Sequence, residues 1–364
     1  MENNCGRKMT RVNFLGDLYL NGSNKNFEYI LDNFKSKFNQ EKEDINFLNL
    51  EAPVTTNISS KDNSKCSIIN EKKSLIKLFE SLNINLVGLA NNHIFDFKEK
   101  GFNDTANFLS FNNINYFGAG NNLKNARTLK VLEKNNIKFG FLGYSWDFIQ
   151  TKYATTLEGG VAPLIESIII SDIKKAKKEV DFLIISFHWG YEREIYPMPS
   201  QRELAHKSID NGADLIIGHH SHVPQGFEKY KNKLIVYSLG NFYFDHFKDE
   251  KFNLIQTDER RQGIHLSIQV KDNLTYNSEI IYFSHDFKKC IISENKDFLS
   301  KPLLLTNNEY NRFWEINRIR ADYPDMYNIK KKYKFISKVY LKIWRLKYRI
   351  LIKLKELIKN KTNE

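Results

Sequence analysis

The chain of 364 residues is longer than most single domains, although α/β folds of more than about 250 residues also form one domain. Hydrophobic residues make up 41% and aromatic residues 13%, which excludes an intrinsically disordered chain. Of the net charge of +12, residues 329–364 carry 13 Lys and Arg against 2 Asp and Glu, which leaves 42 basic and 41 acidic residues elsewhere. Because that remainder is close to neutral, we expect no nucleic-acid partner.

Short apolar runs alternate with segments of helical period, a pattern typical of an α/β fold. Seven runs have the length of buried strands: 12–16, 45–50, 84–90, 137–143, 181–187, 213–218 and 234–239. Helical patterns cover 72–82, 99–111, 171–180 and 200–211, with Ser200 as the expected N-cap of the last. Residues 263–270 and 279–283 alternate apolar and polar, as half-buried antiparallel strands do.

The remaining segments lack this alternation. Residues 24–44 and 57–71 are polar, and we expect both to be irregular surface segments. We divide the chain into an N-terminal tail (1–9), an α/β domain (10–290), an accessory segment (291–328) and a basic helix (329–364).

The cysteine content and the apolar runs indicate the cellular compartment in which we expect the protein. Cys5, Cys66 and Cys290 have no CxxC spacing, so we expect neither a disulfide framework nor a thiolate metal site. The first residues lack the apolar segment of a signal peptide, and no run of about 18 apolar residues occurs. We therefore expect a cytoplasmic protein without a membrane-spanning helix.

Polar side chains follow nearly every predicted strand. They are Asp17, Glu51, Asn92, His93, His188, the cluster His219 to His222, and Asn241. Open α/β sheets bind ligands at the carboxyl ends of their strands, so we expect these side chains to converge. A single His is more often structural, but the joint pattern predicts a hydrolytic site for one or two Mn, Fe or Zn ions. Such ions acidify a water and polarise a phosphoryl or acyl oxygen.

These residues stand in blocks that resemble the capsule synthesis CapA family over about residues 10–285. The blocks are Gly16-Asp17, Asn49-Leu50-Glu51-Ala52-Pro53, Asn91-Asn92-His93 with Asp96, His188-Trp189-Gly190 with Glu192, Gly218-His219-His220-Ser221-His222 and Gly240-Asn241. That family takes part in poly-γ-glutamate capsule formation and belongs to the calcineurin-like metallophosphoesterase superfamily. The resemblance implies a four-layer α/β/β/α sandwich with two mixed sheets.

The resemblance also implies roles for single residues. His93 would be the general acid or a phosphate contact, and Glu192 a nearby acid or hydrogen-bonding group. The implied metal ligands are Asp17, Glu51, Asn92, His188, His220 and His222.

The chain departs from the superfamily pattern at two of these blocks. Tyr19 stands where the first motif, Asp-x-His, carries its imidazole, and Glu51 stands where the second motif carries an Asp. We weigh two functions for this reason. One is a metal-dependent hydrolase or phosphoesterase acting on an anionic polymer or on a phosphorylated or acyl substrate. The other is a non-catalytic accessory or scaffold subunit of a complex that makes and exports a polymer.

Three further polar sites have open or structural interpretations. Asp96 either orients His93 or caps the following helix. Asp214 begins a strand far from its carboxyl end, so a structural role is expected. The pair Arg260-Arg261 is interpreted as a solvated loop, with neutralisation of an anionic substrate as the alternative.

Residues 329–364 have a helical period. Apolar side chains recur at Ile336, Val339, Ile343, Leu346, Ile350, Leu354 and Leu357, and basic residues fill much of the remainder. A basic amphipathic helix of this kind is typical of a bilayer interface, where each basic residue contributes about 1 kcal/mol near anionic lipid. Docking on the protein's own body or on a partner is the alternative. We expect a peripheral protein on the inner membrane face.

We therefore expect the full chain to sediment with anionic lipid vesicles and a chain truncated after Asn328 to stay in the supernatant. Vesicles of neutral lipid serve as the control, because the electrostatic attraction is absent there. If both chains are equally soluble and equally absent from anionic vesicles, the membrane hypothesis is wrong.

Overall fold

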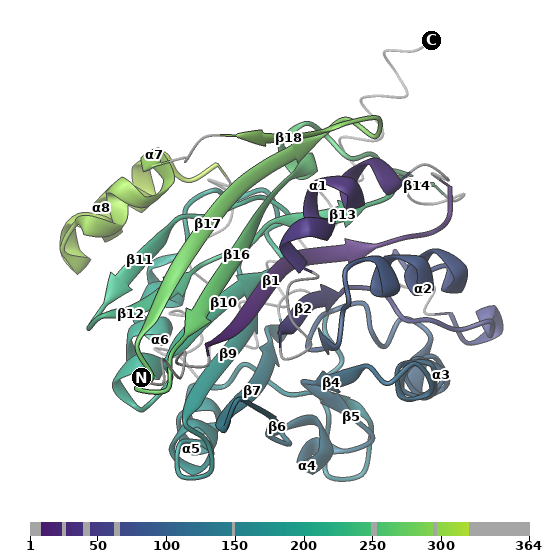
Figure 1. The fold of residues 1–364 in the computed structure, drawn as a ribbon, viewed down its shortest axis with the longest axis horizontal. Coiled ribbons are helices and arrows are strands. Elements are labelled where there is room, and N and C mark those ends of the chain that lie inside the picture. The colour runs from purple at the N-terminus through teal and green to yellow at the C-terminus, as the bar shows by residue number, and fades with distance from the viewer. Residues whose placement is uncertain are drawn as a thin grey trace, which may run out of the picture.

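The computed structural model describes residues 9–23, 27–38, 44–61, 66–147, 150–248, 253–293 and 297–319. Within these ranges the chain forms two mixed sheets with helices on their outer faces (Figure 1). The predicted basic helix, 329–364, lies outside the described residues. Among the described helices, none combines the length and the apolar character needed to cross a bilayer.

The first sheet has a parallel centre and an antiparallel edge. Its order is β18-β17-β16-β1-β2-β3-β4, and β13 also pairs with β1. Strands β1 to β4 run parallel, whereas β16 to β18 are antiparallel. The strands are β1 (Thr10–Tyr19), β2 (Ile45–Leu50), β3 (Leu86–Gly88), β4 (Asn115–Phe117), β13 (Asn241–Phe244), β16 (Gln262–Val270), β17 (Tyr276–His285) and β18 (Cys290–Ser293).

The second sheet has the order β11-β12-β10-β9-β7-β6. Its four central strands are parallel and its two outer strands are antiparallel to their neighbours. The strands are β6 (Lys130–Lys134), β7 (Ile137–Ser145), β9 (Phe182–His188), β10 (Leu215–His219), β11 (Phe227–Tyr230) and β12 (Lys233–Val236). Two short pairs complete the strands: β5 (Ala119–Gly120) with β8 (Gly160–Val161), and β14 (Phe247–Lys248) with β15 (Asn253–Leu254).

Three large apolar clusters lie between adjacent layers of the sandwich. The middle cluster joins the facing sides of the two sheets, for example Phe14 and Phe47 of the first with Phe139 and Ile184 of the second. The outer clusters bury helices on the far side of each sheet. The expected α/β/β/α sandwich with two mixed sheets is therefore confirmed.

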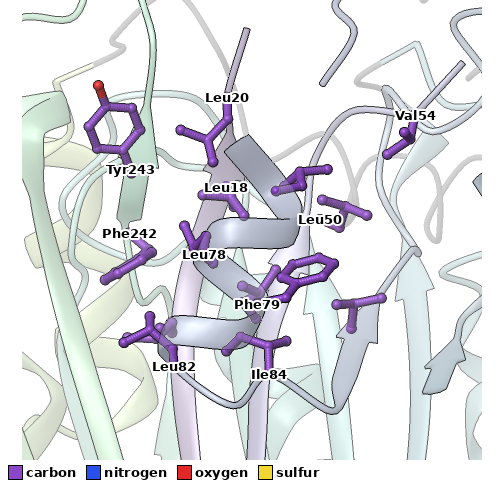
Figure 2. Packing of buried hydrophobic residues seen from close by; sticks show 14 of the residues in the cluster. Leu18, Leu20, Leu50, Val54, Leu78, Phe79, Leu82, Ile84, Phe242 and Tyr243 are labelled. Atoms are coloured by element: carbon purple, nitrogen blue, oxygen red, sulfur yellow. The ribbon is translucent and has the colours of Figure 1, made fainter. Parts of the chain in front are cut away.

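Helices cover both outer faces. The first sheet carries α1 (Glu28–Phe38), α2 (Lys72–Ser81) and α3 (Lys98–Phe111). Figure 2 shows Leu78 and Phe79 of α2 in the same apolar cluster as Leu18 and Leu50 of the sheet. The second sheet carries α5 (Glu166–Ala176), α6 (Pro199–Asp210) and α8 (Asn307–Asn317). The remaining helices are short: α4 (Leu123–Ala126) and α7 (Asp297–Ser300), with 3-10 turns at Ile58–Ser60, Glu259–Arg261 and Lys301–Leu304.

The structure corrects two local predictions. The predicted irregular segment 24–44 contains a helix, because α1 buries Ile30, Leu31, Phe34 and Phe38 at spacings of three and four, a pattern that the low overall hydropathy conceals. Ser200 is not the N-cap of α6. That helix begins at Pro199, whose fixed φ suits the first helical position, and the side chain of Gln201 accepts the backbone N–H of Met198.

Leu78 anchors α2 to the first sheet and is fully buried. We expect Leu78→Ala to lower the free energy of unfolding by about 2–5 kcal/mol, because it removes buried apolar contacts and leaves a cavity. Glu80→Ala, on the exposed side of the same helix, is the matched control and should change it by less than about 0.5 kcal/mol. Chemical denaturation measures both, and equal effects would contradict the packing described here.

Candidate metal centre

The polar cluster lies where the inward-facing rows of both sheets end. Along β1, β2 and β10, apolar residues face the middle cluster until the last inward position, which is polar. In β9 the apolar part of the inward row ends earlier, since Ser186 precedes the polar residue at the last position. Those positions are Asp17, Asn49, His188 and His219. Because these strands run parallel within their sheets, their carboxyl ends bring the four side chains to one edge of the sandwich.

A bulge at Gly16 aims Asp17 at this edge. The register with β2 shifts there, since Leu15 pairs with Leu48 and Asp17 pairs with Asn49. A Cβ on Gly16 would lie 1.9 Å from the carbonyl oxygen of Gly240, so only glycine permits this approach. The neighbouring Asp17 N–H donates to the same oxygen at 2.9 Å.

Asp17 is fully buried and held by three donors. Its carboxylate accepts from Nδ1 of His219 at 3.0 Å, from the backbone N–H of His220 at 3.0 Å and from Nδ2 of Asn49 at 2.8 Å. Burial alone raises the pKa of this carboxyl, but the His219 hydrogen bond and the surrounding imidazoles hold the pKa well below its usual value. Asp17 is therefore anionic at neutral pH.

Glu51 shares the Asn49 amide with Asp17. Nδ2 of Asn49 lies 2.7 Å from Oε2 of Glu51, whereas Oε1 is buried with no hydrogen-bond partner among the described residues. Burial and the nearby Asp17 charge raise the pKa of Glu51 to about 8. An unpaired, buried carboxylate oxygen of this kind suits a cation.

Two groups of ligand atoms meet at Glu51. The donor atoms of Asp17, Glu51 and His188 lie within 4.8 Å of one another, as do those of Glu51, His220 and His222. A carboxylate common to both groups is what a two-ion centre requires.

The imidazoles of His188 and His220 also suit a cation. The Nδ1 atoms of both are buried without a hydrogen-bond partner among the described residues. Burial holds their pKa well below the usual value, which keeps both rings neutral. Neutral imidazoles and carboxylates are the donors that Zn, Mn and Fe accept, so the residues fit one or two such ions.

Asn92 and His222 complete the cluster. Oδ1 of Asn92 lies 2.9 Å from Nε2 of His188, which is itself 3.4 Å from Oε1 of Glu51. Nδ1 of His222 lies 3.5 Å from Asp17 and 2.9 Å from Oδ1 of Asn241. All six residues predicted as metal ligands are thus brought together.

Backbone strain accompanies the placement of the two histidines of the His-x-His turn. His220 has φ +88° and His222 has φ +56°, both in the left-handed region that non-glycine residues rarely adopt. Such residues cost about 1–3 kcal/mol each and persist where the surrounding fold fixes them. Here the buried strand β10 and the hydrogen bond from the His220 N–H to Asp17 fix the turn.

His93 lies on the turn that follows β3. Asn91 connects this turn to β2, donating to Leu50 O at 2.9 Å and accepting the His93 N–H at 3.2 Å. Nδ1 of His93 lies 2.8 Å from Oδ2 of the fully buried Asp96. Asp96 therefore orients His93 and does not cap α3, whose N-cap is Phe97 without a side-chain hydrogen bond.

Glu192 forms an ion pair with Arg260 beside the cluster. The Glu192 side chain is 44% exposed, whereas that of Arg260 is 9% exposed. Burial opposes ionisation of Glu192, but His222 and Arg260 hold its pKa below the usual value. The interpretation of Arg260 as part of a solvated loop is wrong, because Arg260 is buried and the turn Glu259–Arg261 packs against β13.

Sequence reasoning did not assign a role to Asn49 or His219, yet both hold Asp17. Their signal is a polar residue on the inward row of a buried strand. Tyr19, in contrast, takes no part in either ligand group. It is 1% exposed and packs against Phe244 at 5.0 Å between ring centroids. Asp214 is structural as expected, since it accepts the Leu183 N–H and pairs with Lys177.

A family model described as "Bacterial capsule synthesis protein PGA_cap" matches residues 11–246. The chain is 34% identical over 181 residues to the capsule biosynthesis protein CapA of Bacillus anthracis, covering 49% of this chain and 44% of that protein. It is 32% identical over 245 residues to the PGA biosynthesis protein CapA of Bacillus subtilis strain 168, covering 64% and 63%. The chain thus spans less than two thirds of either relative.

Among solved structures, a 5'-nucleotidase precursor from Thermus thermophilus is similar with a TM-score of 0.41 and 14% identity. The similar region covers 75% of this chain and 54% of that one.

Elemental analysis of protein purified without chelator tests the ligand groups. We expect one or two divalent transition-metal ions in the wild type and none in Glu51→Ala, because Glu51 belongs to both groups. His188→Ala and His220→Ala should each disturb only their own group. His206→Ala, which removes an imidazole of α6 that binds Glu228, is the matched control. Wild-type metal content in Glu51→Ala would contradict the shared-ligand arrangement.

Proposed function

Since the chain belongs to the family of bacterial capsule synthesis proteins described as PGA_cap, we propose that it acts in the synthesis of a polyglutamate-type cell-surface polymer as a metal-dependent hydrolase. The observation that carries the proposal is the buried carboxylate of Glu51 between two groups of metal-competent side chains, with His93 beside them. A purely structural role does not require this concentration of buried, unpaired donor atoms.

The residues divide into two roles. Asp17, Glu51, Asn92, His188, His220 and His222 would hold one or two ions of Mn, Fe or Zn. When bound, such an ion polarises the scissile phosphoryl or acyl group and makes a water nucleophilic at neutral pH. His219 and Asn49 keep Asp17 ionised and oriented.

His93 is the proposed general acid. Its Nδ1 is held by Asp96, so the ring presents Nε2 on its opposite edge as the atom that gives a proton to the leaving group. The Asp96 carboxylate, fully buried, stabilises the protonated imidazole before the transfer. Glu192, paired with Arg260 beside the metal centre, is the proposed nearby acid or hydrogen-bonding group.

A second function is favoured by Tyr19. Because this side chain is packed in an apolar cluster with Ala52, Ile68 and Phe244, it supplies no ligand where the superfamily motif has a His. A non-catalytic accessory subunit of a complex that makes and exports the polymer would keep the fold and bind an ion or the polymer without turnover. In either case we propose attachment to the inner membrane face through residues 329–364.

Hydrolysis of a phosphomonoester, a phosphodiester and a poly-γ-glutamate oligomer distinguishes the two functions. We expect metal-dependent turnover of at least one, and His93→Gln should lower kcat by about 10²–10⁴-fold at unchanged metal content, because proton transfer is lost. His206→Gln is the matched control. A fully metal-loaded wild type without turnover on any of the three would favour the accessory subunit.

A further inference from the structure

Arg260 and Glu192 connect two sides of the candidate metal centre. Arg260 lies in the 3-10 turn Glu259–Arg261, which precedes β16 of the first sheet, and Glu192 lies on the loop after β9 of the second sheet. The ion pair between them is therefore a link between the two sheets at the edge where the ligand groups converge.

Both ends of this link are attached to the histidine turn. Nδ2 of Asn241 donates to the carbonyl oxygen of Arg260 at 2.8 Å, while Oδ1 of the same Asn241 lies 2.9 Å from Nδ1 of His222. On the other side, the N–H of Arg193, next to Glu192, donates to Ser221 O at 2.7 Å. Asn241 alone thus separates Arg260 from His222, and Arg193 and Ser221 separate Glu192 from the same turn, so the pair lies beside the second ligand group.

The two members of the pair differ in how firmly they are held. The Arg260 side chain is 9% exposed and that of Glu192 is 44% exposed. A guanidinium is a planar fork that binds oxyanions through two parallel N–H groups, and a buried one requires an anionic partner. Glu192 is thus the more accessible member of the pair, and its side chain can turn toward solvent, whereas the Arg260 side chain stays covered.

We propose that Arg260 is the anion-binding residue of the site and that Glu192 occupies its guanidinium until an anionic oxygen group of the substrate displaces it. The inference rests on the proposed function in that the substrate is anionic, and it adds the residue that recognises the charge. A side-chain carboxylate of a polyglutamate chain and a phosphate group share the required chemistry.

The arrangement predicts opposite effects of removing the two charges. Arg260→Gln removes the anion receptor, so anion affinity should fall roughly ten- to a hundredfold, as for the loss of charge-assisted hydrogen bonds. Glu192→Gln removes the internal competitor, so anion affinity should rise by at least about threefold. A pair that only braces the two sheets would weaken binding when either member is changed.

These affinities are measured by isothermal titration calorimetry on the metal-loaded full chain. The titrants are a poly-γ-glutamate oligomer and, in a separate experiment, inorganic phosphate. Arg312→Gln and Glu315→Gln, on exposed positions of α8, are the matched controls for each change of charge. Arg260→Lys keeps the charge but lacks the planar fork, and it replaces Arg260→Gln if that variant does not fold. The anion affinity of Arg260→Lys should also fall. Metal content and thermal unfolding are recorded for every variant.

Opposite shifts for Arg260→Gln and Glu192→Gln with either probe support the proposal, and the probe that responds identifies carboxylate or phosphate as the recognised group. Shifts of the same sign, or no shift, overturn it. If the wild type binds metal and turns over substrate but both variants bind the anion with wild-type affinity, this inference fails and the proposed function stands. If anion affinity responds but no substrate is turned over, the hydrolase proposal fails alone.

Discussion

Two carboxylates, Asp17 and Glu51, lie fully buried against one Asn49 amide, and the architecture of the site follows from keeping them together. Two like charges this close cannot both ionise without compensation. His219, the His220 N–H and Asn49 stabilise the charge of Asp17. Burial and the charge of Asp17 together raise the pKa of Glu51 instead. The neutral imidazoles of His188 and His220 surround the pair with donor atoms that have no hydrogen-bond partner among the described residues.

Backbone contacts between distant segments hold this arrangement in place. Gly16 meets Gly240, and a Cβ on Gly218 would lie 1.8 Å from the carbonyl oxygen of Tyr237. Glycines at these positions let strands of each sheet approach until their ends share one edge. The left-handed backbone of His220 and His222 has an energetic cost, which the buried core on both sides of β10 offsets.

Charge is organised in shells around the carboxylates. Neutral imidazoles and amides contact them, the Asp96–His93 pair lies on the β3 side, and the Arg260–Glu192 pair lies at the rim. The buried guanidinium of Arg260 gives the anionic interior an adjacent cationic position. This position is the basis of our proposal that an anionic substrate approaches a centre whose own carboxylates would otherwise repel it.

The alternation of apolar runs and helical segments by itself determined the fold class, because burial between two layers requires that pattern whatever the topology. Polar residues at strand ends also predicted that these side chains converge, since parallel strands bring their carboxyl ends to one edge. The set of six proposed ligands and the role of His93 were implied by the resemblance to the CapA family. The sequence did not reveal α1, whose apolar positions are diluted by Lys, Asn and Asp, nor the burial of Arg260. Only the tertiary structure decided those two features, the pairing of Asp96 with His93, and the role of Asn49. Each depends on which segments pack side by side. Sequence spacing carries no record of contacts between residues far apart along the chain.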